Sequence, residues 1–235
     1  GTNINGMTHL YIGTVTEPPE GSTTPIDVGT TKNGSVMLAK VGTSAYVYSP
    51  NGNFQVNPTG GVIGTGNCTY VEVGKYVKNT TLTRYWFQRN TKVNHVKLTD
   101  LDTTQVINMY SMFNGCTNLR KIELPVSKNK NIDLQMFLYN TAALEEIDLS
   151  IFDTSYVQNA TDCFGYSKLS EIDLSTLDLG ELEIAQYMFR DSKATSINLS
   201  GLKTNKLWNV RFMFQSMPNL QNIILDGWDV SNVTD

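Results

Sequence analysis

The sequence has few of the residues that build disulfide frameworks and metal sites. Its three cysteines, Cys68, Cys116 and Cys163, are too few and too far apart for a disulfide framework or a Cys-x-x-Cys metal knuckle. Two of them occupy positions that are apolar or small in other copies of a repeat described below, so we expect buried free thiols. We therefore predict no bound metal and no cofactor.

Basic residues are outnumbered by acidic ones. The chain has 18 Lys and Arg against 22 Asp and Glu, which gives a formal net charge of −4 and a pI near 5.2. Proteins that bind nucleic acid carry a basic surface, and so do proteins held electrostatically on anionic membranes. The composition therefore predicts neither partner.

Long apolar runs are absent from the sequence. No run approaches the roughly 18 residues that cross a bilayer, so we predict no membrane span in this chain. No signal peptide is visible either, but the chain begins Gly1-Thr2 without a methionine, so that absence has little weight. With 235 residues, 40% hydrophobic and 17% charged, the chain can bury a sizeable core.

The sequence does contain a repeat. An Ile-x-Leu pair, or its Val-x-Leu equivalent, recurs every 25 or 26 residues. The pairs are Val96/Leu98, Ile122/Leu124, Ile147/Leu149, Ile172/Leu174, Ile197/Leu199 and Ile223/Leu225. Each pair alternates as a short strand does, and such repeats bury their apolar faces by stacking. We expect parallel strands in one sheet, in an array that begins near Thr69.

Apolar residues between the pairs predict a short helix in each repeat. Val106, Met109 and Phe113 follow one pair at spacings of three and four, which places them on one helical face. The predicted fold class is α/β, a leucine-rich-repeat-like solenoid of about 25-residue repeats, each a parallel strand plus a short helix. We expect a buried ladder of Phe113, Phe164, Phe189 and Phe214 in its core.

One unit departs from the pattern. After Leu124 the sequence reads PVSKNKNIDLQMF, in which the phenylalanine arrives two residues early and Ser127 replaces an apolar residue. Because Ile147 returns to the regular spacing, we expect only a reshaped convex loop around Lys128 and Lys130.

Residues 1–66 differ in composition from the array at 69–235. They hold 12 of the 18 glycines and five of the seven prolines, with strand-like runs between turn signals. We predict a small all-β N-terminal module, with AYVYSPNGNFQV as its clearest hairpin. An extended arm docked on a neighbour, or on the first turn of the solenoid, would use the same composition.

The repeat resembles a known family. Met-Phe, a short polar turn, Leu-x-x-Ile-x-Leu-Ser and Asp-Thr-Ser-x-Val are similar to the BspA-like leucine-rich repeats of bacterial surface proteins, including mycoplasmal and lactobacillal lipoproteins. LEEIDLSIFDTSYV and IILDGWDVSNVTD show the likeness best, and it covers about residues 69–235. The resemblance implies a curved solenoid displayed outside the cell for adhesion to host proteins or other microbes. It implies no catalytic residues.

Histidine is scarce, with only His9 and His95 in the chain. A Ser-His-Asp or Cys-His site would need one of them. His95 shares the outward register of Lys121, Glu146 and Glu171, so we interpret it as a solvated histidine and not as a catalytic base. We predict that the protein is not an enzyme.

Polar side chains beside the strand pairs form the candidate binding site. They are Glu123, Glu146, Asp148, Glu171, Asp173 and Asn198. Neighbouring strands lie about 4.8 Å apart, so these residues would form an acidic patch on the concave face. The patch is either a by-product of the repeated sequence motif, with Lys97, Lys121 and Lys168 reducing the charge repulsion, or a recognition surface for a basic partner. A Ca²⁺ site is a less favoured alternative. We favour macromolecular recognition, because extended ligands sit on solenoid concavities.

Two functional classes fit these features. The first is a bacterial cell-surface adhesin module, extracellular, which binds a protein or glycan ligand. The second is a structural or receptor-binding component of a phage virion, such as a tail-fibre tip. The final repeat stops at Asp235 before its Met-Phe, so we expect a longer natural protein. We also expect end-to-end self-association through this uncapped repeat.

Overall fold

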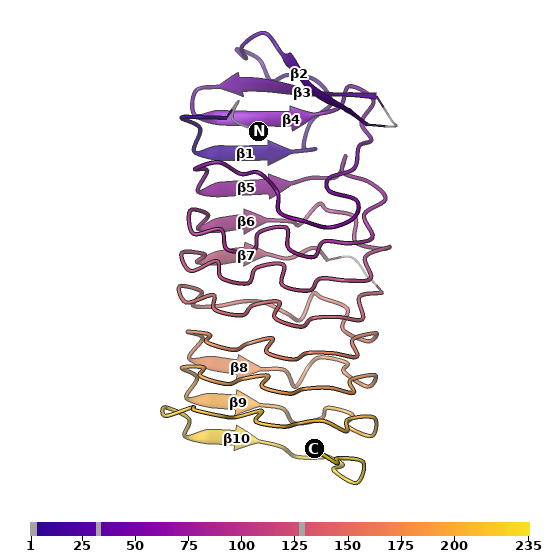
Figure 1. Ribbon diagram of the computed structural model, residues 1–235, viewed down its shortest axis with the longest axis vertical. Helices are drawn as coiled ribbons and strands as arrows, with labels where there is room; N and C mark the ends of the chain where they lie inside the picture. The colour runs from indigo at the N-terminus through magenta and orange to yellow at the C-terminus, as the bar shows by residue number, and fades with distance from the viewer. Residues whose placement is uncertain (1–3, 32–33, 127–129) are drawn as a thin grey trace.

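The computed structural model describes residues 4–31, 34–126 and 130–235, and they form a stack of layers (Figure 1). One wall of the stack, here called the sheet wall, consists of short strands. They are β1 (His9–Ile12), β2 (Ile26–Thr31), β3 (Gly34–Val41), β4 (Ser44–Tyr48), β5 (Tyr70–Val73), β6 (His95–Lys97), β7 (Lys121–Glu123), β8 (Glu171–Asp173), β9 (Ser196–Asn198) and β10 (Asn222–Ile224). The order β2-β3-β4-β1-β5-β6-β7 makes a seven-stranded sheet, and β10-β9-β8 makes a three-stranded one.

The repeat strands pair in parallel, in the register that the spacing predicts. Val71, Val96 and Ile122 lie opposite one another in β5, β6 and β7, and their side chains are buried. In the second sheet the pairing of β8, β9 and β10 aligns Ile172 with Ile197 and Ile197 with Ile223. The repeat spacing therefore corresponds to one layer of the stack.

The expectation of one continuous repeat sheet was wrong. Residues 147–149 form no strand, and the two sheets are separated at this layer. The wider interval between β7 and β8 is visible in Figure 1. The irregular unit that precedes Ile147 therefore has a larger effect than a reshaped loop. Of that predicted loop, Lys128 lies outside the described residues, and Lys130 is exposed.

The predicted α/β class with short helices was also wrong, because the described residues contain no α-helix. The segments that carry Met-Phe, such as residues 110–115 and 161–166, are runs of turns instead, here called the turn wall. In a helix the Phe113 N–H would bond the Met109 carbonyl, four residues back. It donates instead to the carbonyl of Phe137 in the next layer, at 3.1 Å.

Alternating backbone conformations explain this difference. Within each turn-wall segment, two residues four positions apart have positive φ, as at Asp162 (55°) and Tyr166 (56°). Right-handed helices exclude that conformation, and L-residues adopt it singly. The turns leave every second N–H free to bond to the adjacent layer, as Phe164 does to Met188 at 2.9 Å, and the others close local turns. Apolar spacings of three and four suit these consecutive turns as well as a helix.

The phenylalanine ladder is confirmed in part. Phe113 stacks on Phe87, and Phe189 stacks on both Phe164 and Phe214, with ring centroids 5.4–5.7 Å apart. Phe113, Phe164 and Phe189 are buried, and Phe214 is partly buried in the last layers. In the irregular unit the ladder continues through an additional ring, that of Phe137. Its centroid lies 5.3 Å from that of Phe113 and 6.1 Å from that of Phe152.

The N-terminal strands continue the sheet wall. β1 pairs in parallel with β5 on one side and with β4 on the other, so residues 9–12 occupy a layer next to the repeats. The hairpin expected at AYVYSPNGNFQV is not formed. Antiparallel pairing joins β2 to β3 and β3 to β4 instead, and Phe54 makes an isolated parallel bridge to Val77. Gly13 fits the close approach after β1, because a Cβ there would lie 2.6 Å from a methyl group of Val77.

Candidate functional site

The outer face of the sheet wall carries two columns of side chains. The middle residue of β6, β7, β8 and β9 is buried, so the first and third residues of these strands point outward. In-register pairing stacks these residues into columns. The first column is Ser44, His9, Tyr70, His95 and Lys121, then Glu171, Ser196 and Asn222. The second is Tyr46, Tyr11, Glu72, Lys97 and Glu123, then Asp173, Asn198 and Ile224.

Aromatic rings occupy the N-terminal part of this face. Tyr11 stacks on Tyr46 with centroids 4.7 Å apart, and its ring lies 5.6 Å from that of Tyr70. Tyr70 in turn meets His95 edge-on at 4.9 Å. This aromatic group was not predicted, although HLYI and SAYVY alternate between inward and outward residues. Nothing in the sequence indicates that β1, 61 residues before β5, lies beside it.

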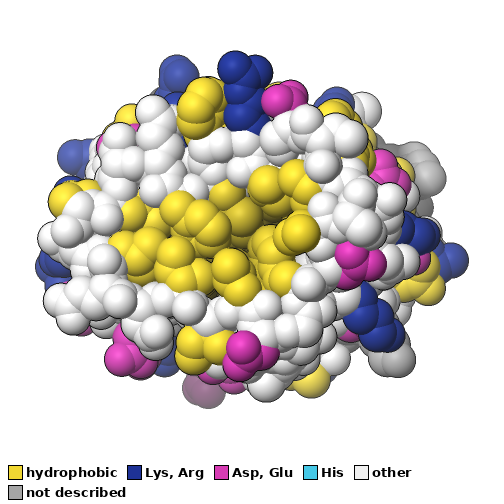
Figure 2. Space-filling view, turned by 90° about the horizontal axis from the view of Figure 1, so that it is seen from below, with side chains coloured by type: hydrophobic (Ala, Val, Ile, Leu, Met, Phe, Trp, Pro, Cys, Tyr) yellow, Lys and Arg dark blue, Asp and Glu magenta, His cyan; other side chains and the backbone are white. Residues whose placement is uncertain are grey.

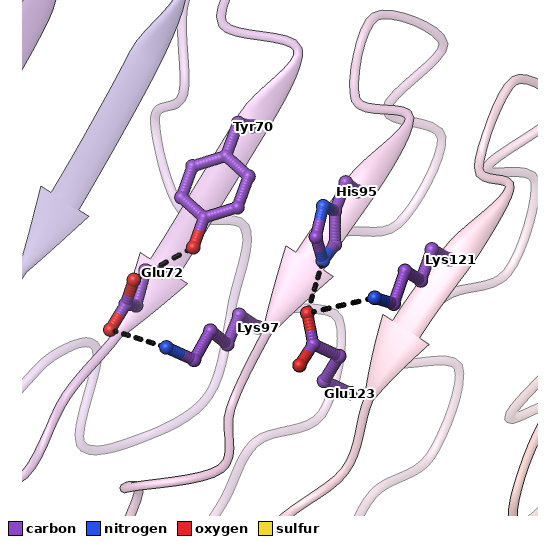
Figure 3. A network of polar contacts seen from close by, with 6 residues as sticks. All are labelled: Tyr70, Glu72, His95, Lys97, Lys121 and Glu123. Carbon is purple, nitrogen blue, oxygen red and sulfur yellow. Dashed lines mark hydrogen bonds and ion pairs between the residues drawn. The ribbon is translucent and has the colours of Figure 1, made fainter.

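Two of these rings, Tyr70 and His95, also belong to a network of polar contacts on β5, β6 and β7 (Figure 3). The Tyr70 hydroxyl donates to Glu72 Oε2 at 2.7 Å, and Lys97 Nζ lies 3.5 Å from Glu72 Oε1. On the next two strands, Glu123 Oε1 lies 2.5 Å from His95 Nε2 and 3.4 Å from Lys121 Nζ. His95 is therefore not a free solvated histidine, since it is tied to a carboxylate on the neighbouring strand.

The network shifts the pKa values of two of its members. Burial and the hydrogen bond to Glu72 raise the pKa of Tyr70 above its ordinary range, so its phenol stays protonated. Burial alone would raise the pKa of Glu123, but the contacts with His95 and Lys121 outweigh it and lower this pKa. Glu123 is therefore ionised and compensated near neutral pH.

The remaining acidic residues on this face have no cationic partner. Glu146, Asp148, Glu171 and Asp173 are exposed, and none of them forms an ion pair with another described residue. Within the described residues, Lys97 and Lys121 form ion pairs with Glu72 and Glu123 of the network, respectively. The five acidic residues of the expected site therefore separate into Glu123, which is compensated, and four carboxylates that pair with no described cation; the sixth residue, Asn198, is uncharged.

Three residues of the predicted site also organise turns. Asp148, Asp173 and Asn198 each accept hydrogen bonds from the N–H and hydroxyl of the serine two positions later, at 2.6–3.1 Å. The hydroxyl and N–H of Ser175 lower the pKa of Asp173, and those of Ser150 lower the pKa of Asp148. Both carboxylates therefore carry a negative charge at neutral pH while they stabilise the chain reversal after the strand.

Two cavities flank the layer that lacks a strand. One, of about 450 Å³, lies between β7 and residues 146–148, and Lys121, Glu123, Glu146 and Asp148 are among its lining residues. The other, of about 330 Å³, separates the same residues from β8 and is lined by Glu145, Glu146, Glu171 and Asp173, among others. Both volumes fall in the range of about 300–1,000 Å³ that is usual for ligand pockets.

Metal and membrane features are not found in the described residues. No group of three or more His, Cys, Asp or Glu side chains there could hold a metal ion. Nor is there, in the same part of the chain, a helix long and apolar enough to cross a membrane.

Comparison with known proteins identifies a family for the repeats. No curated protein and no solved structure gives a significant match to the chain. One family does match, over residues 80–201 and again over 132–235, which together cover more than half of the chain. Its members are described as Mycoplasma proteins of unknown function, and the match covers the stacked layers from the segment before β6 to Asp235. The chain therefore belongs to the DUF285 family.

Proposed function

We propose that this protein is a non-enzymatic binding module at the surface of a bacterial cell. It recognises a host or microbial macromolecule, a protein or a glycan, through the outer face of the sheet wall. One observation carries the proposal: this face joins an aromatic column to four carboxylates that form no ion pair with a described residue, beside two cavities. Membership of a Mycoplasma family and the resemblance to BspA-like surface repeats support the location.

The chemistry of the face favours binding over catalysis. His95, Lys97 and Lys121 are engaged with carboxylates on the same or the next strand. His9 contacts the Thr8 hydroxyl at 2.8 Å but has no carboxylate partner among the described residues, so the described face lacks a complete nucleophile, base and orienting acid. Rows of exposed side chains on rigid strands instead suit the recognition of an extended surface. The charge of the four carboxylates would select partners with a basic region and repel acidic ones.

An array of glycans and extracellular proteins tests the proposal. The wild-type chain should retain ligands that a Glu146→Lys/Glu171→Lys variant loses, because the variant reverses charge at the centre of the face. The matched control is Glu17→Lys/Glu20→Lys, which makes the same change of net charge at exposed positions between β1 and β2. If the control loses the same ligands, or if no ligand distinguishes the face variant from wild type, the proposal fails.

A further inference from the structure

The leucine that follows each repeat strand normally hydrogen-bonds to the next layer. The Leu98 N–H donates to Glu123 O at 2.8 Å, Leu174 to Asn198 O at 2.9 Å, and Leu199 to Ile224 O at 2.9 Å. Leu124 and Leu149 occupy the same position in their layers, but no backbone hydrogen bond from either N–H reaches a described residue of the next layer. These two interruptions lie on the two sides of residues 145–149.

Backbone hydrogen bonds from the first residues of the strands to the preceding layer are interrupted at the same place. Lys121 and Ser196 each donate their N–H to the layer before them, to Asn94 and Ser170 respectively. In the described part of the chain, no such bond connects Glu146 to β7 or Glu171 to residues 145–149. The facing edges of β7 and β8 are thus open, although neither is an end of the stack.

The turn wall is continuous through the same layers. Leu134 donates to Asn159 O at 2.9 Å, and Leu138 donates to Cys163 O at 3.0 Å. The layers are therefore held together on one wall and open only on the sheet wall. A peptide could consequently enter at the break without displacing a backbone hydrogen bond between described residues.

The larger cavity, here called the β7 slot, combines an apolar floor with a charged rim. Ile122 and Ile147 contribute the floor, together with Val126, which is 70% exposed. Glu146 and Asp148 contribute charge that no described cation pairs with, since Lys121, the one cation among the described lining residues, already contacts Glu123. An extended chain that alternates apolar and basic side chains is complementary to this surface, because successive strand residues face opposite sides.

We propose that the β7 slot binds an extended basic peptide segment of a partner protein as an added strand between β7 and residues 145–149. The proposal deepens the proposed function, and it rests on that function. Main-chain hydrogen bonds to the open edges supply affinity, and the floor and the carboxylates select alternating apolar and basic side chains. A glycan would use the charged rim but could not continue the backbone ladder.

The direct test uses a synthetic peptide, acetyl-Lys-Val-Lys-Val-Lys-amide, titrated into the full chain by calorimetry. It should bind, and the peptide with Glu in place of Lys should not. N-methylation of either alternate set of peptide amides should weaken binding about tenfold or more, because each set faces one open edge. A control peptide with one added N-methylglycine beyond the last lysine keeps all these amides and should bind as the parent does.

Hydrogen exchange locates the peptide. Its binding should slow exchange at the Leu124 amide, while the amides of β9, which are already in a three-stranded sheet, should not change. A Glu146→Gln/Asp148→Asn variant keeps the side-chain shapes and should bind the peptide about tenfold more weakly. Asn at the second position can retain the turn, as Asn198 does with Ser200.

The outcomes separate this inference from the proposed function. Peptide binding that is indifferent to N-methylation, or that protects β8 amides and leaves Leu124 unchanged, overturns strand addition in the β7 slot. Failure of the lysine peptide to bind also overturns it, and so does a glycan as the sole array ligand lost in the Glu146→Lys/Glu171→Lys variant. The proposed function stands in both of these last cases, provided that the Glu146→Lys/Glu171→Lys variant loses a ligand on the array that the wild-type chain retains.

Discussion

At the scale of single residues, the phenylalanine ladder makes a direct prediction about stability. Phe164 is 3% exposed and stacks on Phe189 at 5.6 Å. Replacing it with Ala removes buried apolar surface and leaves a cavity, which typically costs about 3–5 kcal/mol of unfolding free energy. We expect Phe164→Ala to melt at a clearly lower temperature in calorimetry. Tyr156→Ala is the control, since Tyr156 is exposed, and equal melting of both variants would contradict the core assignment.

Asp173 predicts a second effect, on acid stability. Its folded-state pKa is lowered by Ser175, so the stability that it contributes is present at neutral pH and is lost as pH falls below about 4. Asp173→Asn should keep the turn and the melting temperature at pH 7, as the natural Asn198 does with Ser200. Its loss of melting temperature on acidification should be smaller than that of wild type. Identical acid curves for the two proteins would show that this carboxylate does not contribute.

At the scale of structural elements, the left-handed residues of the turn wall can be tested by paired substitutions. Asn140 has φ of 55°, and its N–H donates to Gly165 O in the next layer at 2.8 Å. A β-branched residue is strained in this conformation, whereas Gly adopts it freely. Asn140→Val should therefore lose about 1–3 kcal/mol of unfolding free energy, and Asn140→Gly should stay close to wild type. Chemical denaturation measures both, and a tolerated valine would contradict the turn-wall conformation.

At the scale of the whole molecule, the end formed by the last layer predicts self-association. Figure 2 shows a broad apolar surface at this end. Ile197 and Leu199 are fully buried in β9 and just after it, whereas their equivalents Ile223 and Leu225 are 38% and 41% exposed. Apolar patches and open strand edges of this kind promote association. Light scattering over a concentration series should show an increase in mean mass, and Leu225→Glu should abolish it.

The control for that experiment places the same charge elsewhere. Ile107 is 45% exposed but lies outside the last layer, so Ile107→Glu should associate as wild type does. A wild-type chain that stays monomeric at every concentration would contradict the prediction.

Part of the candidate site was predictable from the sequence, because equivalent positions of successive repeats occupy equivalent positions on the stacked layers. The equivalence of Glu146 with Glu171, and of Asp148 with Asp173, follows from the spacing alone. The aromatic column was not predictable, because Tyr11 reaches Tyr70 through pairing of strands far apart in the chain. The spacing predicted that β6 and β7 are adjacent, but the diagonal contact between His95 and Glu123 depends on side-chain conformations that the repeat register does not specify.

The spacing of the Ile and Leu residues is enough to predict the layers, because inward side chains that recur every 25 or 26 residues can be buried only by stacking equivalent units. Apolar spacing could not decide between a helix and consecutive turns at Met109, Phe113 and Cys116, since both conformations bury the same face. The neighbouring layer decided it, because its carbonyls accept alternate N–H groups that a helix would have used internally. The break at residues 145–149 was decided in the same way. Ile147 has the regular strand pattern, but a strand also requires a partner backbone within hydrogen-bonding distance. In the described part of the chain, no backbone hydrogen bond joins residues 145–149 to β7 or β8.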